Sequence, residues 1–353
     1  MPGDARAVLD LIDHFGSPET AWHAAAEDMI TAGIKPKKAH KIAAQRDRIN
    51  LEEAQEKLAA LGIDFICYDD DVYPQMLKHI YDPPVVLFYK GSFCAGDDIA
   101  VAIVGSRKAT YYGKTVAEKL AGDLARNGVT VVSGMARGID TAAHKGALAA
   151  GGRTIAVLGT GLDNVYPREN TKLMEEIAAA GLVLTEFPPE SPGEPWHFPL
   201  RNRIISGLSR GIIVVEAAAR SGALITASLA LEQGREVMAV PGNITIPVAK
   251  GPNRLIKQGA KLVENVGDVL EEIGLTSLFP ARKGMVVQSP NVFDDNERRI
   301  LKMLQWEPLS KDAITARLGL NSQQVSAALS VMEIKGLVRR LPGGLYCSLQ
   351  LED

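Results

Sequence analysis

The sequence is poor in the residues that mark secreted and membrane proteins. Its 353 residues include only three cysteines, Cys67, Cys94 and Cys347, which are far apart and show no CxxC spacing. This pattern argues against a disulfide scaffold and a zinc site, and it favours a reducing cytoplasm. No uninterrupted apolar run approaches the roughly 18 residues of a membrane helix. Residues 1–16 carry acids within their apolar stretch, so we expect neither a signal peptide nor a membrane partner.

The short motifs of common enzymes are also missing. Gly113-Lys114-Thr115 ends like the phosphate loop of nucleoside triphosphatases, but Lys108 stands where that motif needs its first glycine. No GxSxG motif of hydrolases occurs. The dinucleotide motif GxGxxG is absent after the first predicted strand, because Arg107 stands where its second glycine would be. These absences argue against three large enzyme classes.

Two polar residues inside the predicted α/β region invite a catalytic interpretation. Glu216 ends a predicted strand without a second acid, histidine or metal ligand nearby in sequence, so we interpret it as a structural partner of a neighbouring arginine. His144 lies within a predicted helix and has no serine or cysteine nucleophile at a suggestive spacing, which favours a surface or hydrogen-bonded histidine. We therefore expect no catalytic residue, no metal and no cofactor.

Charge is distributed unevenly, although the whole chain carries a net charge of only −3. Residues 1–99 hold 10 basic and 17 acidic side chains, residues 100–260 hold 18 and 13, and residues 261–353 hold 11 and 12. Only the middle segment therefore has a cationic surplus, which suits an anionic partner.

Composition and periodicity divide the chain into four parts. Residues 1–60 show helical spacing of apolar residues and are expected to form a small helical domain of the SAM or helix-hairpin-helix kind. Its Ala32–Lys35 turn only partly matches the latter motif, and a plain helical turn explains it better. Residues 61–275 are expected to form an extended Rossmann-like domain, residues 276–292 a linker, and residues 293–353 a winged-helix domain.

The middle part alternates between short apolar strands and helices. Strands are expected over residues 99–104, 129–132, 154–158, 182–185, 211–215 and 236–240, and helices over residues 113–127, 139–150, 169–180, 201–206 and 223–233. Strands that are apolar along their whole length are covered on both faces, as in parallel sheets with crossover helices. The sequence therefore predicts a doubly wound α/β domain, with its ligand site in the loops after the strand ends.

The last part shows three helical segments followed by a hairpin. The helices are expected over residues 297–305, 310–318 and 322–335, and the hairpin turns at residues 342–344. This is the order of a winged helix. Its third helix, which would be the recognition helix, brings no cation before Lys335, so duplex binding, protein contact and neither role all stay open.

Glycines and arginines recur after three successive predicted strands. They are Gly105, Ser106 and Arg107 after the first strand, Ser133, Gly134 and Arg137 after the second, and Gly159, Gly161 and Arg168 after the third. Glycine lets an anion approach backbone amides, and arginine adds a two-pronged cation. The pattern predicts an anion-binding site at this edge of the sheet.

The connection after the fourth strand carries aromatic and basic residues together. Five prolines lie between Pro188 and Pro199, and Phe198 precedes Arg201, Asn202 and Arg203. Aromatic rings can stack on unpaired bases while guanidinium groups hold phosphates, which favours single-stranded nucleic acid.

Further candidate contacts come from the loop after the fifth strand, where Arg220 and Ser221 precede a predicted helix. For the salt dependence of binding we count five arginines, namely Arg107, Arg137, Arg168, Arg201 and Arg203. If each neutralises one phosphate, the log–log salt slope is about −3.5.

Several strings of the middle part resemble one family. GSRKATYYG, SGMARGIDTAAH, GTGLDNVYPREN, FPLRNRIISGLS and VVEAAARSGALITA, in this order, resemble the DNA-processing protein A family (DprA, also called Smf) over about residues 62–266. The resemblance implies sequence-independent binding and protection of single-stranded DNA, a homodimer, and loading of the RecA recombinase during natural transformation. It also implies that Arg107 leads the DNA contacts, that Arg168 is a second cation, and that Phe198 stacks on a base.

One alternative stays open. Nucleotide-binding phosphoribohydrolases on a related fold also use a glycine-rich phosphate loop, with the pattern PGGxGTxxE. Here Pro241-Gly242-Asn243 does not complete that pattern. The sequence does not locate the dimer or RecA interfaces, and it does not tell whether the N-terminal domain touches DNA.

Overall fold

The structure is a computed structural model. It describes residues 5–46, 48–275, 294–304, 308–335, 337–341 and 343–348. The chain divides into two compact units, Met1–Ala281 and Arg282–Asp353. The predicted linker over residues 276–292 lies outside the described residues, as does Pro342 of the predicted hairpin turn.

The first unit begins with short helices. They are α1 (Ala5–Phe15), α2 (Pro18–His23), α3 (Ala26–Thr31), α4 (Pro36–Arg46) and α5 (Leu51–Ala60). A small apolar core that includes Leu11, Met29 and Ala39 holds the first four together. Ser17 caps α2, accepting a hydrogen bond from the Thr20 N–H at 3.1 Å. Gly33 separates α3 from α4 at a positive φ of 100°, which glycine adopts without strain.

The centre of this unit is a nine-stranded sheet. Its strands are β1 (Asp64–Cys67), β2 (Val86–Gly91), β3 (Ala100–Val104), β4 (Thr130–Ser133), β5 (Thr154–Val157), β6 (Leu182–Thr185), β7 (Gly211–Val214), β8 (Glu236–Ala239) and β9 (Lys261–Leu262). They lie in the order β1-β2-β6-β5-β4-β3-β7-β8-β9. In this spatial order, each pair of neighbouring strands from β6 through β5, β4, β3, β7 and β8 to β9 is parallel. Because the chain moves outward from β3 in one direction and later resumes beside it at β7, the ends of β3 and β7 flank the switch point where such sheets bind ligands.

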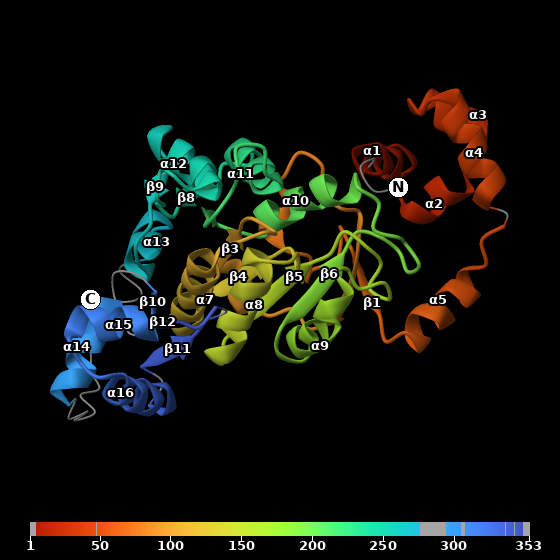
Figure 1. Ribbon diagram of the computed structural model, residues 1–353. Coiled ribbons are helices and arrows are strands. Elements are labelled where there is room, and N and C mark those ends of the chain that lie inside the picture. Colours follow the sequence, from red (N-terminus) through yellow and green to blue (C-terminus); the bar gives the residue numbers. More distant parts are fainter. Residues whose placement is uncertain are drawn as a thin grey trace. The chain divides into compact units, whose positions relative to one another are not determined.

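Helices cover both faces of the sheet. They are α6 (Gln75–Lys78), η1 (Ala95–Asp98), α7 (Tyr111–Arg126), α8 (Ile139–Ala149), η2 (Arg168–Asn170), α9 (Thr171–Ala180), α10 (His197–Gly207), α11 (Gly222–Glu232), η3 (Pro247–Ala249), α12 (Lys250–Lys257) and α13 (Val266–Glu272). Figure 1 shows α7, α8 and α9 on one side of the strands and α10 and α11 on the other. This is the doubly wound arrangement that the sequence predicted.

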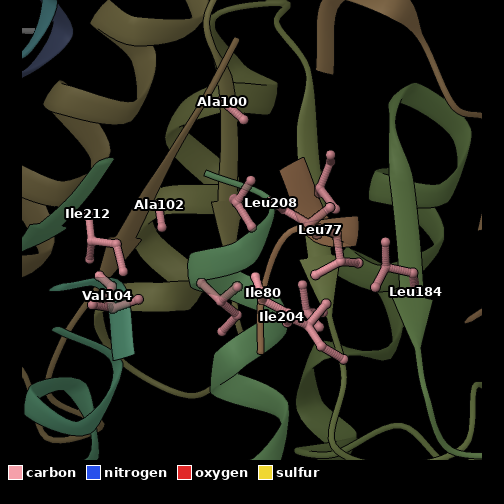
Figure 2. Close-up of a cluster of buried hydrophobic side chains, with 14 of the residues drawn as sticks. Leu77, Ile80, Ala100, Ala102, Val104, Leu184, Ile204, Leu208 and Ile212 are labelled. Atoms are coloured by element: carbon pink, nitrogen blue, oxygen red, sulfur yellow. The ribbon is translucent and has the colours of Figure 1, made fainter. Parts of the chain in front are cut away.

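Alternation along the strands supplies the core of each face. Ala100, Ala102 and Val104 of β3 pack with α10 and α11, whereas Val101 and Ile103 pack with α7 and α8. Figure 2 shows the first of these clusters, in which Ile204 and Leu208 of α10 meet the strand residues. Close packing of these two apolar clusters holds the strand ends in fixed positions.

The structure confirms the six predicted strands and the helices between them to within a few residues. The sequence missed β1, β2 and β9. The first two pair antiparallel at one edge and are only partly buried, so they lack the continuous apolar signal of the central strands. The two residues of β9 are too few to give a pattern.

The second unit is a three-helix fold with a small sheet. It contains α14 (Asp295–Leu304), β10 (Leu309–Ser310), α15 (Lys311–Leu318), α16 (Ser322–Ile334), β11 (Val338–Arg340) and β12 (Leu345–Ser348). The antiparallel sheet has the order β10-β12-β11. Ser310 caps α15, accepting from the Ala313 N–H at 3.2 Å. This is a winged helix, and only the short β10 was missed.

Candidate nucleic-acid interface

The loop after β3 is pressed tightly against its neighbours. A side chain on Gly105 would lie 2.5 Å from Ile139 and 2.9 Å from the Glu216 carbonyl oxygen, so only glycine fits. The Ser106 N–H donates to that same carbonyl at 2.6 Å, and the Ser106 hydroxyl accepts from the Lys108 N–H at 3.1 Å. The loop is therefore fixed at its base.

A second glycine supports the same loop from α8. Gly138 has a φ of +81°, and a side chain there would collide with the Ser106 carbonyl oxygen. That oxygen accepts from the Ile139 N–H at 3.3 Å. The start of α8 thus determines where the loop after β3 lies.

Arg107 leaves this fixed loop into solvent and meets an aromatic ring. Its guanidinium carbon lies 5.1 Å from the centre of the Phe198 ring, a cation–π contact. Phe198 is half-buried and rests on Gly159, where a side chain would lie 3.0 Å from the ring. Tyr166, which is exposed, lies 5.5 Å from Phe198 between ring centres. A cation and two aromatic rings therefore share one edge of the sheet.

These residues border a crevice, a name we use for two adjoining hollows of about 690 and 190 Å³. Side chains that line both hollows are Arg107, Lys108, Ala136, Tyr166, Phe198 and Arg201. The larger hollow extends past Ser106 and Asn202 to Ser221 and Gly222, at the start of α11. It therefore lies at the ends of β3 and β7, at the switch point of the sheet.

Arg201 does not reach into this crevice as a free cation. It is only 3% exposed, and its Nη1 donates to the Gly134 carbonyl at 2.7 Å and to the Val157 carbonyl. Glycine at position 134 leaves room for this guanidinium group, since a side chain there would lie 2.6 Å from that Nη1 and would displace it. Burial lowers the pKa of Arg201 to about 10; Asp140 opposes this fall and the nearby charge of Arg107 adds to it. Arg201 thus ties the ends of β4 and β5 to α10.

A buried acid lies beneath the cations. Asp140 accepts from the Ala136 N–H at 3.3 Å and lines the larger hollow. Burial raises the pKa of this carboxyl to about 6, although Arg201 and Arg107 both oppose the rise. The charge at the crevice therefore changes close to neutral pH.

Arg203 is likewise turned inward. It is 6% exposed, its Nη2 donates to Glu186 at 2.7 Å, and its Nε donates to Asp82 at 3.2 Å. The sequence predicted that Arg201 and Arg203 contact nucleic acid. That remains a prediction, which the burial of both side chains does not support. The helix α10 turns both guanidinium groups into the protein, where carbonyls accept from Arg201 Nη1 and carboxylates accept from Arg203 Nε and Nη2. In the described structure, Arg201 Nε and Arg203 Nη1 have no hydrogen-bond partner.

The remaining predicted arginines are exposed. Arg137 donates twice to Glu169, at 2.8 Å each, so its charge is already paired. Arg168 begins η2 two residues after Tyr166, and Arg220 precedes α11. Neither Arg168 nor Arg220 has a carboxylate partner among the described residues. Of these three, only Arg137 lines the crevice, in its smaller hollow.

The polar candidates have mainly structural contacts. The buried Ser133 hydroxyl donates to the Ile103 carbonyl at 2.6 Å, and Ser221 caps α11 by accepting from the Ala223 N–H at 3.4 Å. Asn202 lines the larger hollow, although its amide lies 3.5 Å from the Gly222 carbonyl. Gly161 lies against the backbone of Pro188, outside the crevice lining.

Of the two interpretations of non-site residues, that of Glu216 requires correction, and that of His144 is confirmed in its second form, a hydrogen-bonded histidine. Glu216 has no arginine partner in the described part of the chain; its carboxylate accepts from the Thr110 N–H and hydroxyl at 2.8 and 2.5 Å and so anchors the start of α7. His144 is not on the surface: it is fully buried, with Nδ1 2.7 Å from the Thr154 hydroxyl, while Nε2 has no partner in the described structure. Burial lowers its pKa to about 3.

Sequence reasoning missed three crevice residues. Lys108 and Tyr166 are exposed and line both hollows, and Asp140 lies beneath them. The signal for Tyr166 was its place beside Arg168 in the loop after β5, whereas nothing in the sequence marks Asp140 as buried. Within the described ranges, no three acids, histidines or cysteines gather as metal ligands would, and no helix has the length and apolar character to span a bilayer.

The fold and the crevice define an α/β protein with a cationic, partly aromatic site at its switch point, joined in one chain to a winged helix. The family model for DNA recombination-mediator protein A matches residues 64–274, and that of the DprA winged-helix domain matches residues 287–344. The chain belongs to this family of DNA-processing proteins, as its motifs indicated.

Relatives support this along most of the chain. Protein Smf of Synechocystis is 38% identical over 95% of this chain and 93% of its own, and DNA processing protein DprA of Bacillus subtilis is 49% identical over 60% and 72%. The X-ray structure of DprA from Streptococcus pneumoniae covers 76% of this chain and 93% of its own, with a TM-score of 0.68 and 40% identity. A second solved structure is that of DNA processing protein A from Helicobacter pylori, described as giving insights into its single-stranded DNA binding mode. It covers 59% of this chain and 94% of its own, with a TM-score of 0.54 and 31% identity.

Proposed function

We propose that this protein binds single-stranded DNA in the crevice, without regard to base sequence. The observation that carries the proposal is the contact between Arg107 and Phe198 at the crevice edge. A phosphate meets the guanidinium group while an unpaired base stacks on the aromatic ring; the fixed loop after β3 holds Arg107, and helix α10 holds Phe198. The relative from Helicobacter pylori, whose single-stranded DNA binding mode is described, supports the same assignment.

The structure changes the number of phosphate contacts that we expect. Arg201 and Arg203 are buried, and Arg137 is paired with Glu169, so these three are left out. Arg107, Lys108 and Arg168 are exposed and have no carboxylate partner among the described residues. Arg107 and Lys108 line the crevice, and Arg168 lies beyond its lining, two residues after Tyr166. Three contacts predict a log–log salt slope of about −2 for a strand that is held in the crevice and reaches Arg168.

A salt titration with short oligonucleotides of different sequence tests this proposal. Strands of about 4 nucleotides, the lower end of the usual site size, should bind with similar affinity whatever their sequence and with that slope. A slope near zero, or affinity for one sequence only, would refute phosphate-directed binding.

We further propose a binding role without catalysis, in the cytoplasm. Family membership supports the role of recombination mediator, and with it protection of incoming DNA and loading of RecA during natural transformation. Phosphoribohydrolase activity is the alternative, and release of ribose phosphate from nucleoside monophosphates by the purified protein would favour it.

A homodimer is the last element of this proposal. Two copies on one strand would raise apparent affinity through effective concentration. Sedimentation at micromolar protein, with and without DNA, checks this, and a monomer in both conditions would count against it.

A further inference from the structure

The outer surface between α7 and α8 carries a hollow that the proposed function does not use. Its volume is about 460 Å³, and we call it the α7–α8 hollow. The side chains that give it its charge are Arg107, Lys114, Glu118, Arg137, Lys145 and Glu169. Four cations thus face two acids, and the pairing of Arg137 with Glu169 leaves three cations against Glu118.

Close packing of the two helices creates this hollow. Gly146 of α8 lies so near the Glu118 backbone that a side chain there would collide with the Glu118 carbonyl oxygen. Lys114, in the first turn of α7, and Lys145, in the second turn of α8, therefore line one hollow. Both lysines are exposed, and neither forms an ion pair within the described ranges.

The hollow is continuous with the crevice. Arg107 lines both hollows of the crevice and the α7–α8 hollow, and Arg137 is shared with the smaller crevice hollow. Both helices begin at the strand ends that border the crevice, so the hollow runs from its rim along the helical layer. A chain held at Arg107 that leaves the crevice on this side meets Lys114 and Lys145 next.

The chemistry of the lining indicates what it binds. None of its residues is aromatic, so bases have no ring to stack on, whereas ammonium groups are point charges suited to phosphates. We propose that the α7–α8 hollow is a second phosphate-binding subsite, which holds the backbone of the single strand where it leaves the crevice. This inference rests on the proposed function, because the strand must first be bound at Arg107.

The expected effect follows from counterion release. Each phosphate contact to a single strand contributes about −0.7 to the salt slope, which equals roughly fivefold in affinity at about 0.1 M salt. Replacing both lysines, Lys114→Gln with Lys145→Gln, should weaken binding of a strand of about 16 nucleotides roughly 25-fold. The slope should fall from about −3.5 to about −2, while a strand of about 4 nucleotides should bind almost as before.

A matched control removes the same charge from elsewhere in the unit. Lys119 lies on α7 but does not line the hollow, and Lys257 lies on α12; both are exposed. The double variant Lys119→Gln with Lys257→Gln should keep wild-type affinity and slope for both lengths.

Arg107→Ala separates failure of this inference from failure of the proposed function. If Arg107→Ala weakens both lengths but the Lys114 and Lys145 double variant matches wild type on the long strand, the second subsite is refuted and the crevice stands. An equal loss at both lengths in that double variant would also refute it, because the lysines would then belong to the primary site. If Arg107→Ala has no effect on either length, the proposed function itself fails.

Discussion

Replacing Phe198 tests whether an aromatic ring of the crevice stacks on unpaired bases. The guanidinium carbon of Arg107 lies 5.1 Å from the centre of the ring, and the centre of the Tyr166 ring lies 5.5 Å from it. Phe198→Ala therefore removes a surface on which a base can stack and also a support that orients Arg107. Stacking on an aromatic ring contributes about 1–3 kcal/mol per base, or roughly 5- to 150-fold in affinity.

The two contributions differ in their dependence on salt. If Phe198 stacks on a base, Phe198→Ala lowers affinity for single strands while the salt slope stays unchanged, because no phosphate contact is lost. If it only orients Arg107, the slope itself falls by about 0.7. We expect the first result, measured by fluorescence anisotropy at several salt concentrations. Binding to duplexes, whose base faces are covered, should hardly change.

A conservative variant serves as the control. Phe198→Leu keeps apolar packing against Gly159 and Gly193 but offers no π face. It should therefore bind single strands nearly as weakly as Phe198→Ala while melting close to wild type. Full single-strand affinity in Phe198→Leu, or a lowered melting temperature with intact affinity in Phe198→Ala, would refute base stacking and make Phe198 a packing residue.

Three further predictions follow from the buried parts of the site. Because the pKa of Asp140 is about 6, lowering the pH from 7 to 5 removes a negative charge beside Arg107. Affinity for single strands should then rise roughly three- to tenfold. In Asp140→Asn, the affinity should depend much less on pH. Arg203→Ala leaves Glu186 buried without its cation and should cost about 3–5 kcal/mol in denaturant unfolding, with DNA affinity unchanged well below the melting temperature. Gly138→Ala, which collides with the Ser106 carbonyl, should lower both stability and DNA affinity, whereas Gly151→Ala, with a similar φ of +70° and open space, should cost only about 1 kcal/mol and leave affinity intact.

The pH prediction also has a consequence for stability. The folded-state pKa of Asp140 lies above its ordinary value of 3.8, so the folded protein takes up a proton before the unfolded chain does. Its contribution to the free energy of unfolding should therefore rise as the pH falls from about 7 towards 4. This rise in the free energy of unfolding should be absent in Asp140→Asn. Urea unfolding of both proteins at pH 7 and pH 5 therefore checks the pKa of Asp140.

The central fold could be predicted because its strands are buried on both faces. Every residue of β3, from Ala100 to Val104, is apolar and buried, and such a run followed by Gly105 gives a clear signal. Strand β2, which lies next to the edge strand β1, gives no such signal, since most of its residues are only half-buried and the charged Lys90 interrupts its apolar run. A strand that is only partly buried is thus harder to predict from the sequence than one that is buried along its whole length.

The sequence predicted a site at the strand ends, where the structure has the crevice, but it counted more free cations than the structure leaves exposed. Arg107 and Phe198 do meet, although 91 positions separate them in the chain. In the sequence, Arg201 and Arg203 look like exposed cations of the same kind as Arg107, because arginines beside aromatic residues suggest an exposed surface. Only the direction in which α10 turns reveals that carbonyls of the strand ends hold Arg201 and that Glu186 holds Arg203.

The most direct test of the account is the affinity of Arg107→Ala for single-stranded DNA, measured beside wild type and beside Arg126→Ala. Arg126 is an exposed arginine of α7 paired with Asp123, and it lines neither hollow of the crevice. The account predicts that Arg107→Ala binds single strands at least roughly fivefold more weakly at about 0.1 M salt, with a slope reduced by about 0.7, while it melts like wild type and Arg126→Ala binds normally. Unchanged affinity and slope in Arg107→Ala would contradict it.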